Sequence, residues 1–79
     1  MNERATPERG SPLPIWVVYD HPADFPHCFV ARMHLDEKPT ANMIVSPELD
    51  HIRMVLEAHG LIRFARHDED DPKIVECWL

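Results

Sequence analysis

The six histidines among its 79 residues are the groups in this chain best suited to chemistry. Five possible metal ligands lie in one short stretch: Asp20, His21, Asp24, His27 and Cys28. Imidazole, thiolate and carboxylate groups bind zinc when three or four of them converge on a tetrahedron, usually from spacings such as CxxC or HxxxH. The stretch contains neither spacing, so we interpret it as a loop in which aspartates cap turns. We expect no metal and no cofactor, and we keep a site at His21, Asp24, His27 and Cys28 as the alternative.

An acidic run, Asp68 to Asp71, is a second candidate for binding a cation. It does not match the EF-hand loop, because Lys73 stands where that loop needs glycine and Leu79 stands where it needs glutamate. We therefore expect a solvated loop, which discourages edge pairing beside the apolar closing strand.

Nucleophilic catalysis has few candidates in this chain. Cys28 and Cys77 both fall in apolar segments, whereas a reactive thiol needs an exposed, electropositive setting. Ser46 is the only serine in the part of the chain that we expect to fold, and the start of a helix accounts for it. A domain of this size also has little volume for a deep pocket. We therefore expect a protein that is not an enzyme.

The segment from Ser46 to Gly60 is predicted to be a helix, and the other elements must cover one side of it. Ser46 is suited to cap its start, Pro47 to the first helical position, and Gly60 to a left-handed end. The residues that form its inner stripe at helical spacing are Leu49, Ile52, Val55, Leu56 and His59. The charged residues that fall on the opposite side are Asp50, Arg53 and Glu57.

Segments rich in β-branched and aromatic residues predict five strands around this helix. They cover residues 15–20, 28–36, 42–45, 61–66 and 73–79. The order β-β-β-α-β-β is typical of a small α+β domain with a mainly antiparallel sheet and the helix packed on one face. We expect residues 15–79 to form this single domain. Residues 1–14, with three prolines and almost no large apolar residue, are expected to form a disordered tail.

Alternation along the second strand assigns its residues to two faces. The residues expected to meet the helix are Phe29, Met33 and Leu35. Those expected on the other face include Cys28, Val30, Arg32 and His34.

The overall charge argues against nucleic acid as a partner, and a locally basic face stays open as the alternative. Eight basic residues against fourteen acidic residues leave a formal net charge of −6, whereas nucleic-acid binding depends on lysine and arginine neutralising phosphates. No apolar run is long enough to span a membrane, and the charged N-terminal residues do not resemble a signal peptide. Two cysteines are too few for a disulfide framework. We therefore expect a cytoplasmic protein that binds neither nucleic acid nor membranes.

Two stretches of the chain, WVVYDHPADFPHCFVAR and DDPKIVECWL, resemble a group of short bacterial proteins of unknown function. The shared features are a strand, a loop bracketed by prolines and a closing strand. The resemblance implies a bacterial cytoplasmic origin, and it implies no activity, cofactor or catalytic residue.

The hypothesis for function concerns the sheet face that the helix leaves open. The first and last strands carry apolar side chains on both faces, and one helix covers only one of them. Some large apolar side chains must then lie outside the core, where a contiguous patch usually marks an interface. We expect the interface to consist of Trp16, Val18, Val30, Ile74 and Trp78. The chain would use it to form a homodimer or to bind a protein partner, as a small interaction module. The alternative is that the N-terminal tail, the DHPADFPH loop or the twist of the sheet covers these residues.

Overall fold

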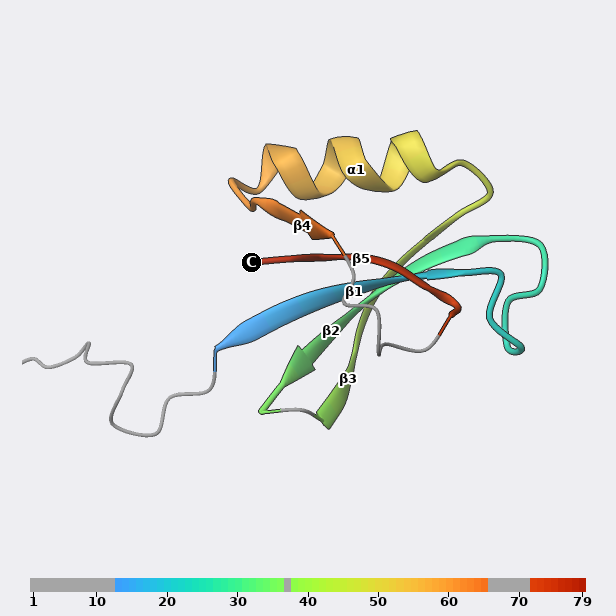
Figure 1. The fold of residues 1–79 in the computed structure, drawn as a ribbon, viewed down its shortest axis with the longest axis horizontal. Coiled ribbons are helices and arrows are strands. Elements are labelled where there is room, and N and C mark those ends of the chain that lie inside the picture. The colour runs from blue at the N-terminus through green and yellow to red at the C-terminus, as the bar shows by residue number, and fades with distance from the viewer. Residues whose placement is uncertain (1–12, 37, 66–71) are drawn as a thin grey trace, which may run out of the picture.

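The computed structural model describes residues 13–36, 38–65 and 72–79. The described chain forms five strands and one helix: β1 (Pro14–Asp20), β2 (Phe29–Leu35), β3 (Lys38–Ser46), α1 (Leu49–Ala58), β4 (Arg63–Ala65) and β5 (Ile74–Trp78). All the strands belong to one antiparallel sheet, and α1 lies across one face of it (Figure 1). The structure is therefore a small α+β fold, as predicted.

The order of the strands in the sheet is β3-β2-β1-β5-β4. The first three strands form a meander, and α1 then carries the chain across to β4 at the other edge. The closing strand β5 inserts between β4 and β1, so the two ends of the folded chain pair with each other at the centre of the sheet. The edges are therefore β3 and the three-residue strand β4.

The third strand is longer than predicted, because it begins at Lys38 instead of residue 42. The predicted strands left residues 37–41 unassigned, but Pro39 lies within β3, where an edge strand tolerates its missing N–H group. The pairing of β3 with β2 is irregular at this point, and Thr40 accommodates the irregularity by donating a hydrogen bond from Oγ1 to the carbonyl of Met33 at 2.8 Å. At the other end of the domain, Pro14 belongs to β1 and not to the predicted tail, of which residues 1–12 lie outside the described residues.

Helix α1 begins two residues later than the first predicted helical position. Ser46 is the last residue of β3, and Glu48 occupies the cap position. The Ser46 hydroxyl nevertheless accepts a hydrogen bond from the backbone N–H of Glu48 at 3.1 Å, so it stabilises the turn that leads into the helix. The predicted end is confirmed: Gly60 has φ +80°, and the N–H groups of Gly60 and Leu61 donate to the carbonyls of Glu57 and Leu56.

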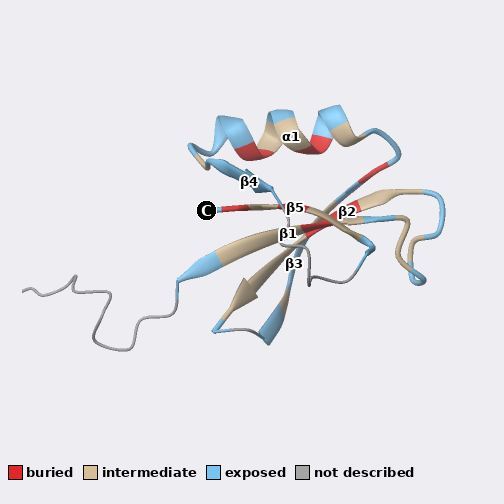
Figure 2. Cartoon of the chain, viewed as in Figure 1, coloured by how far each residue is buried: buried red, intermediate tan, exposed pale blue. Residues whose placement is uncertain are grey.

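The core lies between α1 and the sheet, where red marks the buried residues in Figure 2. Its buried members are Val18, Ala31, Ile52, Leu56 and Trp78. The partly buried side chains that pack around them include Trp16, Phe29, Ile44 and Leu49. The inner stripe of the helix is therefore confirmed for Leu49, Ile52 and Leu56, and the side chain of His59 is exposed.

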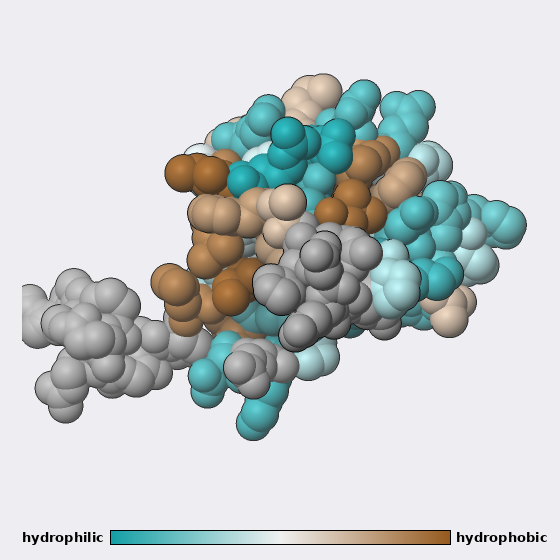
Figure 3. Space-filling model, in the orientation of Figure 1, coloured by the Kyte–Doolittle hydropathy of each residue, from teal (hydrophilic) through white to brown (hydrophobic). Residues whose placement is uncertain are grey.

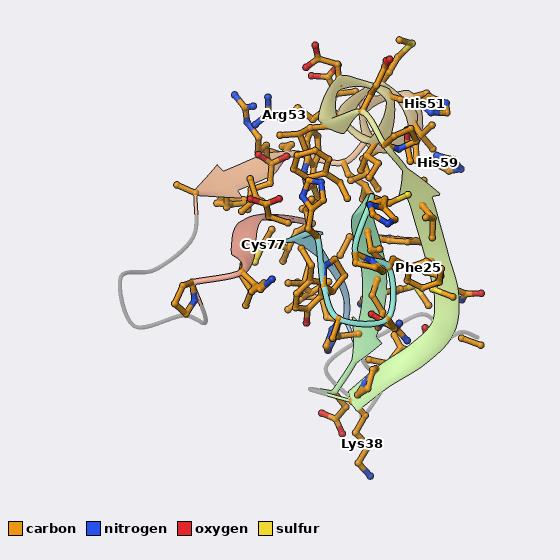
Figure 4. The ribbon with its side chains drawn as sticks, turned by 90° about the vertical axis from the view of Figure 1, so that its right-hand side faces the viewer. Phe25, Lys38, His51, Arg53, His59 and Cys77 are labelled. Carbon is orange, nitrogen blue, oxygen red and sulfur yellow. The ribbon has the colours of Figure 1, made fainter. Side chains whose placement is uncertain are left out.

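Glu76 is a carboxylate buried beneath the helix, with 3% of its surface exposed. Arg53 donates two hydrogen bonds to it, from Nη2 at 2.8 Å and from Nε at 3.1 Å, and Trp78 donates a third from Nε1 at 2.9 Å. Arg53 lies on the side of α1 above β4 and β5, whereas His51 and His59 lie on the side toward β3 (Figure 4). The prediction that Arg53 lies on the outer side of the helix is therefore wrong, because a buried acid attracts it inward.

Candidate functional site

The sheet face opposite α1, called the open face below, receives alternate residues of each strand. Val18, Ala31 and Trp78 are buried against the helix, so their neighbours along the strands point the other way. The register places these neighbours opposite one another: Ile15 with His34, Val17 with both Arg32 and Cys77, Tyr19 with Val30, Arg32 with Met43, Val30 with Val45, and Phe64 with Cys77. The predicted placement of Val30, Arg32 and His34 on one face is confirmed.

Apolar side chains dominate the part of the open face formed by β4, the C-terminal end of β5 and the N-terminal half of β1. Two backbone hydrogen bonds between Ile62 and Leu79, at 2.8 and 3.0 Å, extend the pairing of β4 and β5 by one row and place both side chains on this face. We call this region the apolar patch; it consists of Ile15, Val17, Ile62, Phe64, Cys77 and Leu79. Ile62 is 65% exposed and Phe64 is 51% exposed, so the patch meets solvent in the monomer.

The exposed apolar side chains of this protein are concentrated on the open face. Seven large hydrophobic residues are exposed in the described part of the chain, and five belong to this face: Met43, Val45, Ile62, Phe64 and Leu79. The other two are Leu13, just before β1, and Met54 on the helix. Figure 3 shows hydrophobic surface gathered beside the C-terminus and the beginning of β1. Exposed apolar side chains in the described part of the chain are therefore distributed unevenly between the two sides of the domain.

A hollow of about 420 Å³ lies beside the apolar patch on the open face. We call it the Arg32 hollow. Its polar lining residues are Tyr19, Asp24, Arg32 and His34, and its apolar ones are Pro22, Val30 and Pro39. Pro22 and Asp24 come from the loop between β1 and β2, so this loop folds over the open face and forms one wall.

Two polar contacts connect the side chains that line the Arg32 hollow. Arg32 donates a hydrogen bond from Nη2 to Oδ2 of Asp24 at 3.2 Å, and the Tyr19 hydroxyl lies 3.3 Å from Nε2 of His34. Burial, reinforced by the positive charge of Arg32, lowers the pKa of His34 below its ordinary value. At neutral pH the hollow therefore combines one fixed positive charge, from Arg32, with a neutral imidazole.

The residues proposed as the alternative metal site do not converge. The His21 ring contacts the carboxylate of Asp20, and Asp24 pairs with Arg32. His27 is exposed and Cys28 is half-buried. In the described ranges of the chain, no three His, Cys, Asp or Glu side chains lie together in a way that could hold a metal ion.

The expected interface residues are divided between the two faces of the sheet. Val18 and Trp78 are buried in the core and Trp16 packs against it, so their predicted placement on the open face is wrong. Val30 and Ile74 pair with Tyr19, on the open face, although only 1% of Val30 is exposed. Alternation could not show which side of β1 and β5 faces the helix, because each of these strands carries apolar residues on both sides. The structure shows it through Glu76. Glu76 lies on the same side of β5 as Trp78 and binds Arg53 of the helix.

A second hollow, of about 410 Å³, opens between the C-terminal half of α1 and the sheet. It is lined by Trp16, Ile44, Val55, Leu56, His59 and Leu61. The imidazole of His59 donates a hydrogen bond from Nδ1 to the carbonyl of Val55 at 2.8 Å, so this nitrogen is used within the helix. The remaining lining is apolar and continues the core, which leaves few groups to orient a ligand.

Comparison with known proteins adds no relative to these observations. No family model, curated protein or solved structure matches the chain. Among the residues that the structure describes, no helix is long and apolar enough to cross a membrane.

Proposed function

We propose that this chain is a small, non-enzymatic interaction module that forms a homodimer through its apolar patch. The observation that carries the proposal is the concentration of exposed apolar side chains on the open face, where Ile62, Phe64 and Leu79 adjoin one another at the edge of the sheet. Burial of this surface against a partner removes it from water, which is the main favourable term in protein association.

The chemistry of the patch favours a second copy of the chain as the partner. Two molecules with a formal net charge of −6 repel each other, so a self-complementary contact needs a region without acidic groups. The apolar patch contains no charged side chain. A two-fold dimer brings the same patch of both copies together, and an uncharged patch permits this without repulsion.

Association also supplies stability that a domain of this length lacks. A chain of about 60 folded residues buries only about 60% of the surface that it exposes when unfolded. Face-to-face packing of two sheets, about 10 Å apart, would convert the apolar patch into a second hydrophobic layer. We also propose a cytoplasmic location, which is favoured by the lack of a disulfide between Cys28 and Cys77.

Sedimentation across a concentration series tests the dimer. We expect the parent chain to associate at micromolar concentration and Phe64→Glu to remain monomeric, because the new charge would be buried without a partner in an apolar contact. Met54→Glu is the matched control, since Met54 is 64% exposed and lies on the helix, away from the patch. This variant should associate as the parent does.

Two results would overturn the proposal. One is a parent chain that sediments as a monomer at high micromolar concentration. The other is equal weakening of association by Phe64→Glu and Met54→Glu, which would indicate a general effect of added negative charge.

A further inference from the structure

The guanidinium of Arg32 is only partly used by its surroundings. An arginine carries five N–H donors. In the part of the chain that the structure describes, one hydrogen bond from Arg32 is found, to Asp24 at 3.2 Å. The Arg32 side chain is 26% exposed, so its remaining donors stay accessible from the Arg32 hollow.

Asp24 is a weak competitor for this charge. Its side chain is 58% exposed, and it lies in the loop between β1 and β2. Ion pairs this exposed contribute little to stability, since water solvates both groups almost as well when they separate. A second carboxylate that enters the hollow can therefore replace Asp24 at small cost.

We propose that the Arg32 hollow binds the carboxylate group of a small organic acid, with the carboxylate on Arg32 and the apolar body against Pro22, Val30 and Pro39. The volume of about 420 Å³ lies in the range of small-molecule sites. A guanidinium binds carboxylates through two parallel hydrogen bonds, a geometry that ammonium groups cannot provide. The Tyr19 hydroxyl and the ring of His34 lie beside Arg32 and supply the remaining polar contacts.

The charges around the hollow favour a carboxylate over a phosphate. Among the described residues that line the hollow, Arg32 is the one fixed cation, His34 is neutral at pH 7, and Asp24 adds a negative charge. The positive charge of Arg32 is nearly cancelled by the negative charge of Asp24, so a dianionic phosphate would gain little attraction and would be repelled by Asp24. A carboxylate with a single charge needs one guanidinium and gains from the apolar walls.

Titration of the full chain by ¹H–¹⁵N NMR tests this inference, with benzoate as the probe. We expect saturable shifts at residues of the hollow with benzoate, and no saturation with benzamide, which has the same shape without the charge. N-acetyl-leucine serves as a second carboxylate: tighter binding of it than of benzoate assigns the site to a peptide terminus, and the reverse assigns it to a free organic acid. Both results support carboxylate recognition.

Two variants at the hollow should change the affinity in opposite directions. Arg32→Gln should weaken benzoate binding by about tenfold or more, which corresponds to the loss of a charge-assisted pair. Asp24→Asn should strengthen it by roughly threefold, because it removes the competing carboxylate. Arg63→Gln is the control, since the Arg63 side chain is 52% exposed and lies on the helix-facing side of the sheet, opposite Trp78.

Three outcomes would overturn the inference: no saturable binding of either carboxylate, equal binding of benzoate and benzamide, or tighter binding of inorganic phosphate than of benzoate. The Arg32 hollow and the apolar patch share no residue, although Val17 of the patch pairs with Arg32 across β1 and β2. Repeating the titration with the Phe64→Glu variant separates the two, because that variant should lose association and keep benzoate binding.

Discussion

Arg53 on α1 and Glu76 on β5 form a bidentate ion pair. Nη2 lies 2.8 Å from Oε1, and Nε lies 3.1 Å from Oε2. The pair joins the helix to the strand that closes the sheet, 23 residues further along the chain. It also fixes which side of β5 faces the helix, because a carboxylate with only 4% of its side chain exposed must point toward its cation. Trp78, two residues further on, is thereby placed in the core.

Loss of the Arg53 guanidinium should destabilise the folded domain. Among the described residues, Arg53→Ala would leave the buried Glu76 carboxylate with the Trp78 indole and the more distant Arg63 as partners, the latter at 4.0 Å. We expect the free energy of unfolding to fall by about 3 kcal/mol, as for other buried pairs that lose one member. Chemical denaturation measures this. Asp50→Ala is the control. The exposed Asp50 side chain lies 3.9 Å from Arg53, and its loss should change the free energy of unfolding little.

The same pair should make the domain sensitive to acid. Burial alone would raise the pKa of Glu76, but hydrogen bonds from Arg53 and Trp78, together with the charges of Arg53 and Arg63, lower it below its ordinary value of 4.5. Between the lowered value and 4.5 the unfolded chain binds more protons than the folded chain, so stability falls as the pH falls. The contribution is complete above pH 4.5 and is lost as the pH drops through the folded pKa.

Glu76→Gln should flatten this dependence. We expect the variant to be less stable than the parent near neutral pH and to lose less stability on acidification to about pH 3, since it has no carboxylate to protonate. Parallel denaturation curves at both pH values would check this. An equal loss in parent and variant would assign the acid sensitivity to other carboxylates.

The sequence was sufficient to predict the elements but not their arrangement. Gly60 and the apolar spacing of Ile52 and Leu56 identified the helix, because helix ends and amphipathic stripes depend on residues close together in the chain. The face of β1 could not be predicted, since Trp16 and Val17 are both apolar. It depends on a long-range pairing of Trp16 with Trp78 that only the folded sheet creates.

Only the part of the candidate site that lies on one strand could be predicted, because the other residues join it through long-range contacts. Alternation placed Arg32 and His34 on one face of β2. Tyr19 joins them only because β1 pairs with β2, and Asp24 only because the loop between these strands folds over the sheet. No local pattern in the sequence signals either event.

The core around Leu56 should be sensitive to truncation. Leu56 is 1% exposed and packs against the buried cluster that includes Trp78. Leu56→Ala should lower the free energy of unfolding by about 2–5 kcal/mol, through lost burial and the cavity left behind. Leu79→Ala, a truncation at a position that is 39% exposed, should have a much smaller effect when measured on the monomer. Similar losses for both variants would mean that the core is centred elsewhere.

Trp78→Glu should unfold the domain, in contrast to the expectation for an interface residue. Its indole is 2% exposed and donates a hydrogen bond to Glu76 at 2.9 Å, so a carboxylate there would be buried next to another carboxylate. Circular dichroism should show loss of cooperative melting. A folded variant that had merely lost association would contradict the placement of Trp78 in the core.

Gly60 should be needed for its backbone conformation and not for its small size. A Cβ atom at this position would meet nothing within 4 Å, whereas φ is +80°. Gly60→Ala should therefore cost about 1 kcal/mol from backbone strain alone. Asparagine tolerates left-handed conformations better than alanine, so Gly60→Asn should cost less, as measured by thermal unfolding. Equal costs for the two variants would contradict this origin of the effect.

His34 should titrate below the ordinary histidine value of 6.5, because burial and then the charge of Arg32 disfavour its protonated form. Between the lowered pKa and 6.5 the unfolded chain binds more protons at this position, so this contribution to stability falls as the pH drops below 6.5. NMR titration of the imidazole signals measures the folded pKa directly. In Arg32→Gln the charge is absent and burial remains, so the pKa of His34 should rise toward 6.5 without reaching it. A His34 pKa at or above 6.5 in the parent would mean that the ring is solvated and that Arg32 lies farther from it.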